Sequence, residues 1–473
     1  MAYRSMDTLL KRFVFLLPTN QERLRQLLLV TVFLSVTSKL VLSVLVMAYH
    51  PNGVWGDSDS LEYHRLALNL LQHGTFSQSP QAPYEPEVLR TPAYPLMLAG
   101  FYGIFGIQPV IIVFLQIALS VATIFIGFKI AALLFHEQAG LLTALLLAAD
   151  PVSIYHTQVL LTETAFTTTV SLCLLLFLHA LKNPSRRHWS AGASISLALS
   201  TYLRPTSYYL GFIFPIIFFI MTCPTIGWRR ATKSALIFLS LYALLTGGWQ
   251  LHNYVQTGSI EFSQMKNRYL FVAKAAAIVA TLDDLSIEDA QQHLAVEHFQ
   301  SIPPDLRAAS PTRFFESQGK YAVAIIVEHP ALFLWTTLKG VIASLFGPSN
   351  LSHLFGLDSV ELRKSLLKGD FSTFSYSHWT MAFGSWIYGV GFLIILYLGI
   401  LRLFVRGRFL SQGMALLLFT VLYVLFLSSG PEAYSRFRLP IMPVLCVMAA
   451  AGFIHPSKTT GPPQNSQRNG AES

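Results

Sequence analysis

Residues 27–48 read LLLVTVFLSVTSKLVLSVLVMA, and Lys39 is the only charged residue in this stretch. A helix that crosses the hydrocarbon core of a bilayer needs about 20 apolar residues, so this stretch is long enough to cross it. It is longer than the apolar core of a signal peptide, and no small-x-small cleavage site follows it. We therefore expect an uncleaved first transmembrane helix, with Lys39 paired inside a helix bundle.

The composition of the whole chain agrees with a membrane protein. Of its 473 residues, 53% are hydrophobic and 12% are charged, against about 25% charged residues in a soluble domain. The mean hydropathy is +0.50. The net charge is +9, but the basic residues form short clusters between apolar runs, which indicates the positive-inside rule and not nucleic-acid binding. The three cysteines show no disulfide or metal-site spacing.

The apolar runs predict an all-α polytopic membrane protein, a single bundle of about 10 to 11 transmembrane helices over residues 27–455. The runs lie near residues 27–48, 109–135, 138–149, 158–181, 189–203, 206–222, 232–248, 382–404, 410–428 and 438–454. No repeat of 20 to 50 residues is present, which excludes a solenoid.

The basic clusters predict the orientation of these helices, because Lys and Arg concentrate on the cytoplasmic side. We place residues 1–26 in the cytoplasm, two outer loops at about 49–108 and 249–381, and a disordered cytoplasmic tail at 456–473. The clusters on the cytoplasmic side are Arg4, Lys11, Arg12, Arg23 and Arg25; Lys182, Arg186 and Arg187; Arg229, Arg230 and Lys233; and Arg402, Arg406 and Arg408.

The apolar run at residues 321–346 contains Glu328, His329, Pro330 and Lys339. If it crossed the membrane, the arginine cluster that follows residue 401 would face outward. We therefore interpret it as an interfacial or re-entrant helix pair.

The first outer loop contains the stretch WGDSDSLEYHRLALNLLQHGTF at residues 55–76. Apolar residues recur in it at helical spacing, which predicts a short amphipathic helix on the membrane surface. The segment LRTPAYPLMLAGFYGIFG at 89–106 then predicts a second interfacial helix.

Asp57 and Asp59 are the candidates for chemistry in this loop. A carboxylate that is partly desolvated at the membrane boundary has a raised pKa and can act as a general base. Two simpler interpretations stay open: Asp59 followed by Glu62 is a capping-box pattern, and the Asp-x-Asp pair can bind a divalent metal, although such a cation needs further oxygen ligands.

Five segments together resemble the GT-C glycosyltransferases, specifically the bacterial protein-mannosyltransferase-like group (glycosyltransferase family 39), which is related to the lipid A aminoarabinose transferases. The first outer loop is similar to that of the group, with Ala93 where the group has glycine. The other similar segments, in the order of the group, are DPVSIYHTQVLLTETAF (150–166), LALSTYLRPTSYYL (197–210), GGWQLHNYVQTGSIEFS (247–263) and EAYSRFRLPIMPVL (432–445). His252 replaces an arginine of the group.

The resemblance implies an inverting transferase in a bacterial inner membrane, with its active site on the periplasmic side. Its donor would be a sugar on a polyprenyl phosphate, and its acceptor an envelope glycan, lipid or protein. Asp59 lies four residues before Tyr63 and therefore takes the place of the base, with Asp57 as the second candidate. No cofactor is implied.

The resemblance and the residue chemistry suggest further substrate-binding residues, each with a structural alternative. Arg204 suits a phosphate because its planar fork binds two oxygens; otherwise it anchors its helix at the interface. Glu163 belongs to the site or is a buried partner of an arginine. Arg436 and Arg438 bind phosphate or anchor the last span. Tyr63 stacks on sugar or belongs to the interfacial aromatic belt.

Two other classes of protein remain as alternatives. A transporter or flippase of a lipid-linked saccharide usually has inverted repeats and broken helices at mid-membrane, which this sequence does not show. A membrane scaffold leaves the acidic first loop unexplained.

Overall fold

The computed structural model describes residues 20–55, 58–303, 310–347, 351–357, 364–365, 368, 375–407, 411–430 and 434–454, and every regular element within them is a helix. The predicted N-terminal segment before residue 20 and the predicted tail at 456–473 lie outside these residues. The all-α membrane fold class is confirmed.

Ten helices correspond to the ten predicted spans. They are α2 (Gln21–Tyr49), α5 (Pro109–Leu134), α6 (Glu137–Ala148), α8 (Glu163–Lys182), α9 (Arg187–Leu203), α10 (Leu210–Ile226), α11 (Trp228–Thr257), α19 (Tyr376–Val405), α20 (Gln412–Ser428) and α21 (Met442–Phe453). In the described part of the chain, seven are long and apolar enough to cross a membrane, when the short helical turns η2 (Pro205–Ser207) and η5 (Ser435–Ile441) are counted with α10 and α21. The helices α6 and α20 are apolar but shorter, and the serine-rich α9 packs between α8 and α11.

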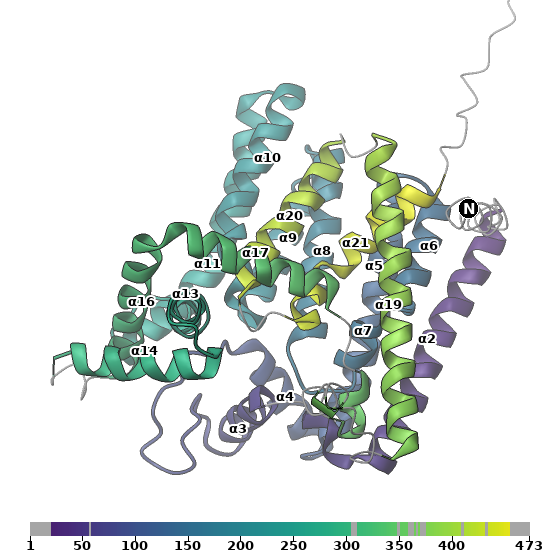
Figure 1. The fold of residues 1–473 in the computed structure, drawn as a ribbon. Coiled ribbons are helices and arrows are strands. Elements are labelled where there is room, and N and C mark those ends of the chain that lie inside the picture. The colour runs from purple at the N-terminus through teal and green to yellow at the C-terminus, as the bar shows by residue number, and fades with distance from the viewer. Residues whose placement is uncertain are drawn as a thin grey trace, which may run out of the picture.

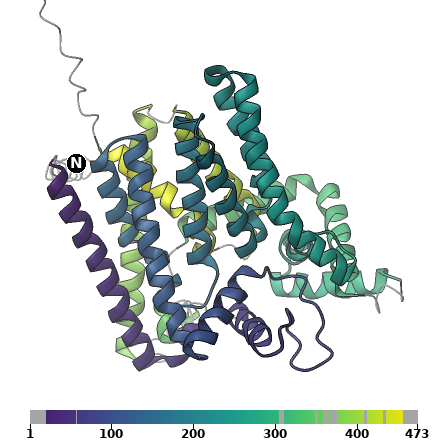
Figure 2. The same cartoon turned by 180° about the vertical axis from the view of Figure 1, so that it is seen from behind.

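The bundle is centred on α8 and α21, which are the most buried of the spanning helices. The helix α8 packs against α5 and α9, and α21 packs against α19. Small residues let α19 and α21 approach closely: a Cβ atom on Gly399 would lie 2.6 Å from the carbonyl oxygen of Ala449. Such contacts are typical of helix packing in membranes. The helix α2 stands at one edge of the bundle and α10 and α11 at the other (Figures 1 and 2).

Lys39 lies in the middle of α2 and is fully buried. Its Nζ atom donates a hydrogen bond to Ser120 Oγ of α5 at 2.9 Å. The predicted pairing of this lysine inside the bundle is confirmed.

One end of the bundle holds the elements of the first outer loop. They are η1 (Pro51–Trp55), α3 (Ser58–His73) and α4 (Ala93–Phe105), and α7 (Pro151–His156) lies beside them. The helix α19 starts at this end and finishes at the opposite end, where α2 begins (Figure 1). The first residues of α19 and the basic residues at its C-terminus therefore lie at opposite ends of the bundle, as the predicted topology requires.

The stretch predicted as the second outer loop contains a set of helices that we call the outer module, Met265–Phe346. Its elements are α12 (Met265–Tyr269), the π-helix η3 (Leu270–Ala275), α13 (Ala276–Leu282), α14 (Ile287–Ser301), α16 (Pro311–Glu328) and α17 (Pro330–Phe346). Residues of η3, α13, α14 and α16 form a hydrophobic core separate from that of the bundle. The helices α16 and α17 meet at an angle of 104°, which excludes a straight crossing by the predicted helix pair.

Candidate active site

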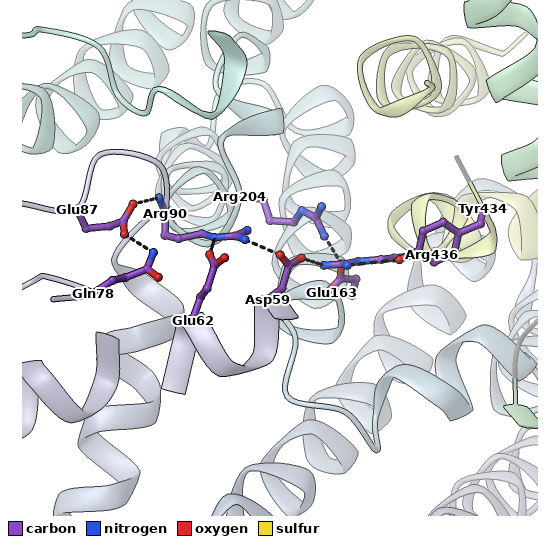
Figure 3. A network of polar contacts seen from close by, with 9 residues as sticks. All are labelled: Asp59, Glu62, Gln78, Glu87, Arg90, Glu163, Arg204, Tyr434 and Arg436. Carbon is purple, nitrogen blue, oxygen red and sulfur yellow. Dashed lines mark hydrogen bonds and ion pairs between the residues drawn. The ribbon is translucent and has the colours of Figure 1, made fainter. Parts of the chain in front are cut away.

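Six charged side chains form a continuous network at the end of the bundle that carries α3 and α4, where α3, the loop after it, α8, α9 and η5 (Ser435–Ile441) meet (Figure 3). Acidic and basic groups alternate along it, in the order Glu62, Arg90, Asp59, Arg436, Glu163 and Arg204. Segments far apart in the sequence therefore contribute to one site.

Asp59 lies in the first turn of α3, where the positive end of the helix dipole favours a carboxylate. Its Oδ2 atom accepts a hydrogen bond from Arg436 Nη2 at 2.8 Å, and its Oδ1 atom pairs with Arg90 Nη2. Glu62, which would close the capping box, instead accepts from Arg90 Nε at 2.7 Å. The geometry therefore favours a site residue over a simple helix cap.

Our prediction that the Asp59 carboxyl has a raised pKa is wrong. Burial raises this pKa, but the guanidinium groups of Arg436 and Arg90 outweigh burial and bring it below the usual value of aspartate. Asp59 is therefore ionised at neutral pH and can accept a proton, but it is a weaker base than a solvated carboxylate.

Arg90 and Glu62 belong to the charged network, and the sequence analysis did not select them. The backbone N–H of Arg90 donates to Glu87 Oε1 at 2.9 Å, and its guanidinium lies over the Tyr63 ring, 5.2 Å from the centroid. Arg90 falls inside the LRTPAYP segment that supported the family resemblance, and this was the available signal. Through Arg90, the loop after α3 thus holds the carboxylate of Asp59 in the first turn of that helix.

Glu163 is fully buried at the start of α8, where the helix dipole favours its charge. Its Oε1 atom accepts from both Arg204 Nη1 and Arg436 Nε, and its Oε2 atom has no partner among the described residues. The side chains of Arg204 and Arg436 are 21% and 8% exposed. One buried carboxylate therefore holds two arginines, and Arg204 is the more accessible of them.

The remaining predicted site residues lie outside this network. Arg438 is fully buried, and its Nη1 atom donates to the carbonyl oxygens of Ser344 and Gly347, both at 3.1 Å, at the end of α17. Tyr63 is buried and contacts Tyr94 edge to face, with 5.1 Å between ring centroids. Its ring therefore packs between Tyr94 and the guanidinium of Arg90. Asp57 lies outside the described residues.

No metal cluster is visible in the described part of the chain. A search of these residues finds no group of three or more His, Cys, Asp or Glu side chains placed to hold an ion. The network itself offers carboxylates that are already neutralised by arginines, which suits an anionic ligand better than a cation.

The helical bundle with a charged site at its outer end has the fold of the GT-C membrane glycosyltransferases. The apo oligosaccharyltransferase of Archaeoglobus fulgidus is similar to the chain with a TM-score of 0.51 and 13% identity, over 91% of this chain and 50% of that one. The same enzyme tethered to an acceptor peptide gives a TM-score of 0.50 and 14% identity, over 92% and 49%. The chain thus spans about half the length of that enzyme.

Residues 89–247, about a third of the chain, match the family model described as dolichyl-phosphate-mannose-protein mannosyltransferase. ArnT from Cupriavidus metallidurans, bound to undecaprenyl phosphate, has a TM-score of 0.44 and 13% identity, over 89% of this chain and 76% of that one. No curated protein matches the sequence. The resemblance to the GT-C, protein-mannosyltransferase-like group is confirmed. The matched region includes two of the five segments on which it rested, 150–166 and 197–210, and the second half of the first, 89–106.

Proposed function

We propose that the protein transfers a sugar from a polyprenyl-phosphate donor to an acceptor on the outer side of the membrane, with inversion at the anomeric carbon. The observation that supports this most directly is the contact between Asp59 and Arg436, which sets a carboxylate beside two arginines at a partly exposed site. The matched family model, whose description names a lipid-phosphate sugar donor, supports the donor class.

The reaction needs a base and an anion site. An acceptor hydroxyl attacks the anomeric carbon while its proton passes to Asp59, and the bond from that carbon to the phosphate oxygen breaks with its electron pair. The leaving polyprenyl phosphate gains charge, which preorganised donors stabilise. Asp59 serves as the base in this proposal because it is ionised and carried on a helix.

Arg204 is the first contact for the phosphate in this proposal. Its guanidinium is the most accessible of the three in the network, and only its Nη1 atom is engaged with Glu163. The remaining N–H groups can form a two-oxygen fork with a phosphate. Glu163 then positions both arginines, and Arg436 stands between the phosphate and Asp59.

The outer module and the α3–α4 loop flank this site from the outer side, and we assign acceptor binding to residues 264–320. The acceptor is an envelope glycan, lipid or protein, and the membrane is the bacterial inner membrane. A divalent metal that bridges Asp57 and Asp59 would make the activity sensitive to a chelator, which tests that alternative directly.

The test is turnover of a labelled polyprenyl-phosphate sugar by the purified protein in lipid. Release of free polyprenyl phosphate is expected, and Asp59→Asn should abolish it, because the amide keeps the shape but accepts no proton. Glu85→Gln, at an exposed carboxylate of the α3–α4 loop, is the matched control and should be fully active. Movement of the lipid without cleavage would favour a flippase, and full activity of both Asp59→Asn and Asp57→Asn would overturn the proposed base.

A further inference from the structure

Both carboxylate oxygens of Asp59 are engaged by arginines. Arg90 contacts Oδ1, and Arg436 contacts Oδ2 at 2.8 Å. A base needs a lone pair within hydrogen-bonding reach of the acceptor hydroxyl, and a carboxylate neutralised on both sides attracts that proton weakly. In the structure, Asp59 is therefore poorly placed to take a proton from an acceptor.

Arg436 is also committed to carboxylates. Its Nη2 atom binds Asp59 and its Nε atom binds Glu163, while Nη1 lies 3.5 Å from the hydroxyl of Tyr434. The network as a whole contains three arginines and three carboxylates. An incoming phosphate thus meets a neutral cluster, and it can bind Nη1 and Nη2 of Arg436 together as a two-oxygen fork only if Asp59 leaves Nη2.

The two carboxylates differ in how much they depend on Arg436. Glu163 is completely buried, so the loss of a guanidinium would leave its charge poorly compensated away from water, which is costly. Asp59 is 23% exposed and would keep its contact with Arg90. Exchange at Asp59 is therefore the less costly of the two.

We propose that the phosphate of the donor displaces Asp59 from Arg436, so that the base becomes available only when the donor is bound. Arg436 is then a positioning residue that links the two substrates of the reaction. This inference rests on the proposed function, because it needs a phosphate at Arg204 and a base at Asp59. It assigns to one contact, Arg436 to Asp59, the role of holding the base inactive in the empty site.

The first experiment compares the equilibrium affinities of three proteins for polyprenyl phosphate, measured in detergent without acceptor. Asp59→Asn removes the carboxylate that competes for Arg436. The variant protein should bind polyprenyl phosphate about tenfold more tightly than the unmodified protein, because the phosphate no longer has to break one partly exposed charged contact. Glu62→Gln makes the same change of charge nearby but leaves the Arg436 contact, so it should stay within about threefold of the unmodified protein. Equal affinities of Asp59→Asn and Glu62→Gln would overturn the inference.

A double-mutant cycle separates competition from simple charge. In an Arg436→Gln background, Asp59→Asn should no longer tighten binding beyond the effect of Glu62→Gln, because no shared arginine remains. If Asp59→Asn does not fold, Asp59→Ser gives the same comparison. Turnover of labelled donor by the unmodified protein is measured in parallel. The absence of turnover rejects the proposed function. Turnover together with no coupling energy between Asp59 and Arg436 rejects only the displacement of Asp59 by the phosphate.

Discussion

Replacing Arg204 by lysine tests whether this residue binds phosphate or only anchors α9. Arg204 is the residue that follows the last turn of α9, its Nη1 atom pairs with Glu163 Oε1, and its guanidinium lies 6.0 Å from the centroid of the Phe166 ring. Lysine keeps the charge and can still pair with Glu163. It offers a single ammonium group and loses the planar fork that could hold Glu163 and a phosphate together.

The expected loss is about 10²–10³ in rate, or about 2.7–4 kcal/mol, the usual effect of removing one donor that stabilises a developing anion. The contact strengthens as the leaving phosphate gains charge, so kcat and kcat/KM should fall together. The free energy of unfolding should change little, because lysine can keep the ion pair with Glu163 and the other ion pairs of the network do not involve Arg204. An anchoring residue would instead leave the rate almost unchanged, since lysine also extends its charge to the interface.

The assay is single-turnover release of polyprenyl phosphate from a labelled donor, with the protein in lipid nanodiscs. Arg65→Lys is the matched control, because Arg65 is exposed on α3 and lies at the same end of the molecule. Turnover by Arg204→Lys within about threefold of the control would refute the phosphate clamp and favour anchoring.

Three further predictions concern pH, packing and topology. Activity should fall as the pH drops through the pKa of Asp59, which lies below the usual value of aspartate. Arg90→Gln removes one of the groups that lower this pKa and should shift this acidic limb of kcat/KM to higher pH. Gly399→Ala should cost about 1–3 kcal/mol in thermal stability, because its Cβ would meet α21, whereas Gly391→Ala, with open space around it, should not destabilise; equal melting would contradict the packing. Ser377→Cys, exposed at the start of α19, should react with an impermeant thiol reagent in intact cells, and reaction only after permeabilisation would reverse the topology.

The fold was predictable because the bilayer admits few structures. A chain in hydrocarbon must satisfy its backbone hydrogen bonds internally, so apolar runs of sufficient length become helices. The helix α9 was also predicted, but the reason that it tolerates so many serines was not: Ser190 and Ser194 donate to carbonyl oxygens of α11. Those partners are distant in sequence and leave no local signal.

Four of the six residues of the charged network were predicted from the sequence, but their ion pairs were not. Asp59, Glu163, Arg204 and Arg436 were selected for their charge at outer helix ends, and the fold brings all four together. Their ion pairs depend on the relative placement of α3, α8 and η5, which sequence spacing does not contain, so the lowered pKa of Asp59 could not be foreseen.

Arg436 and Arg438 were treated as equivalent, and the structure separates them. Each residue turns a 3₁₀ helix by about 120°, so side chains two residues apart point in directions about 120° apart. Because η5 is such a helix, the two arginines diverge: Arg436 contacts Asp59, and Arg438 contacts the end of α17.

The outer module is attached to the bundle in a way that matters for protein engineering. Its Tyr269 hydroxyl donates to the Ser428 carbonyl oxygen at 2.7 Å, and Lys274 Nζ binds the carbonyl oxygen of Ser429. In return, Arg438 holds the carbonyl oxygens at the end of α17. Because every acceptor here is a backbone carbonyl group, a chimera that takes residues 265–346 from a relative needs matching donors: side chains in the positions of Tyr269 and Lys274, and the arginine at position 438. Two stretches of chain that lie more than eighty residues apart must therefore be checked together before either is exchanged.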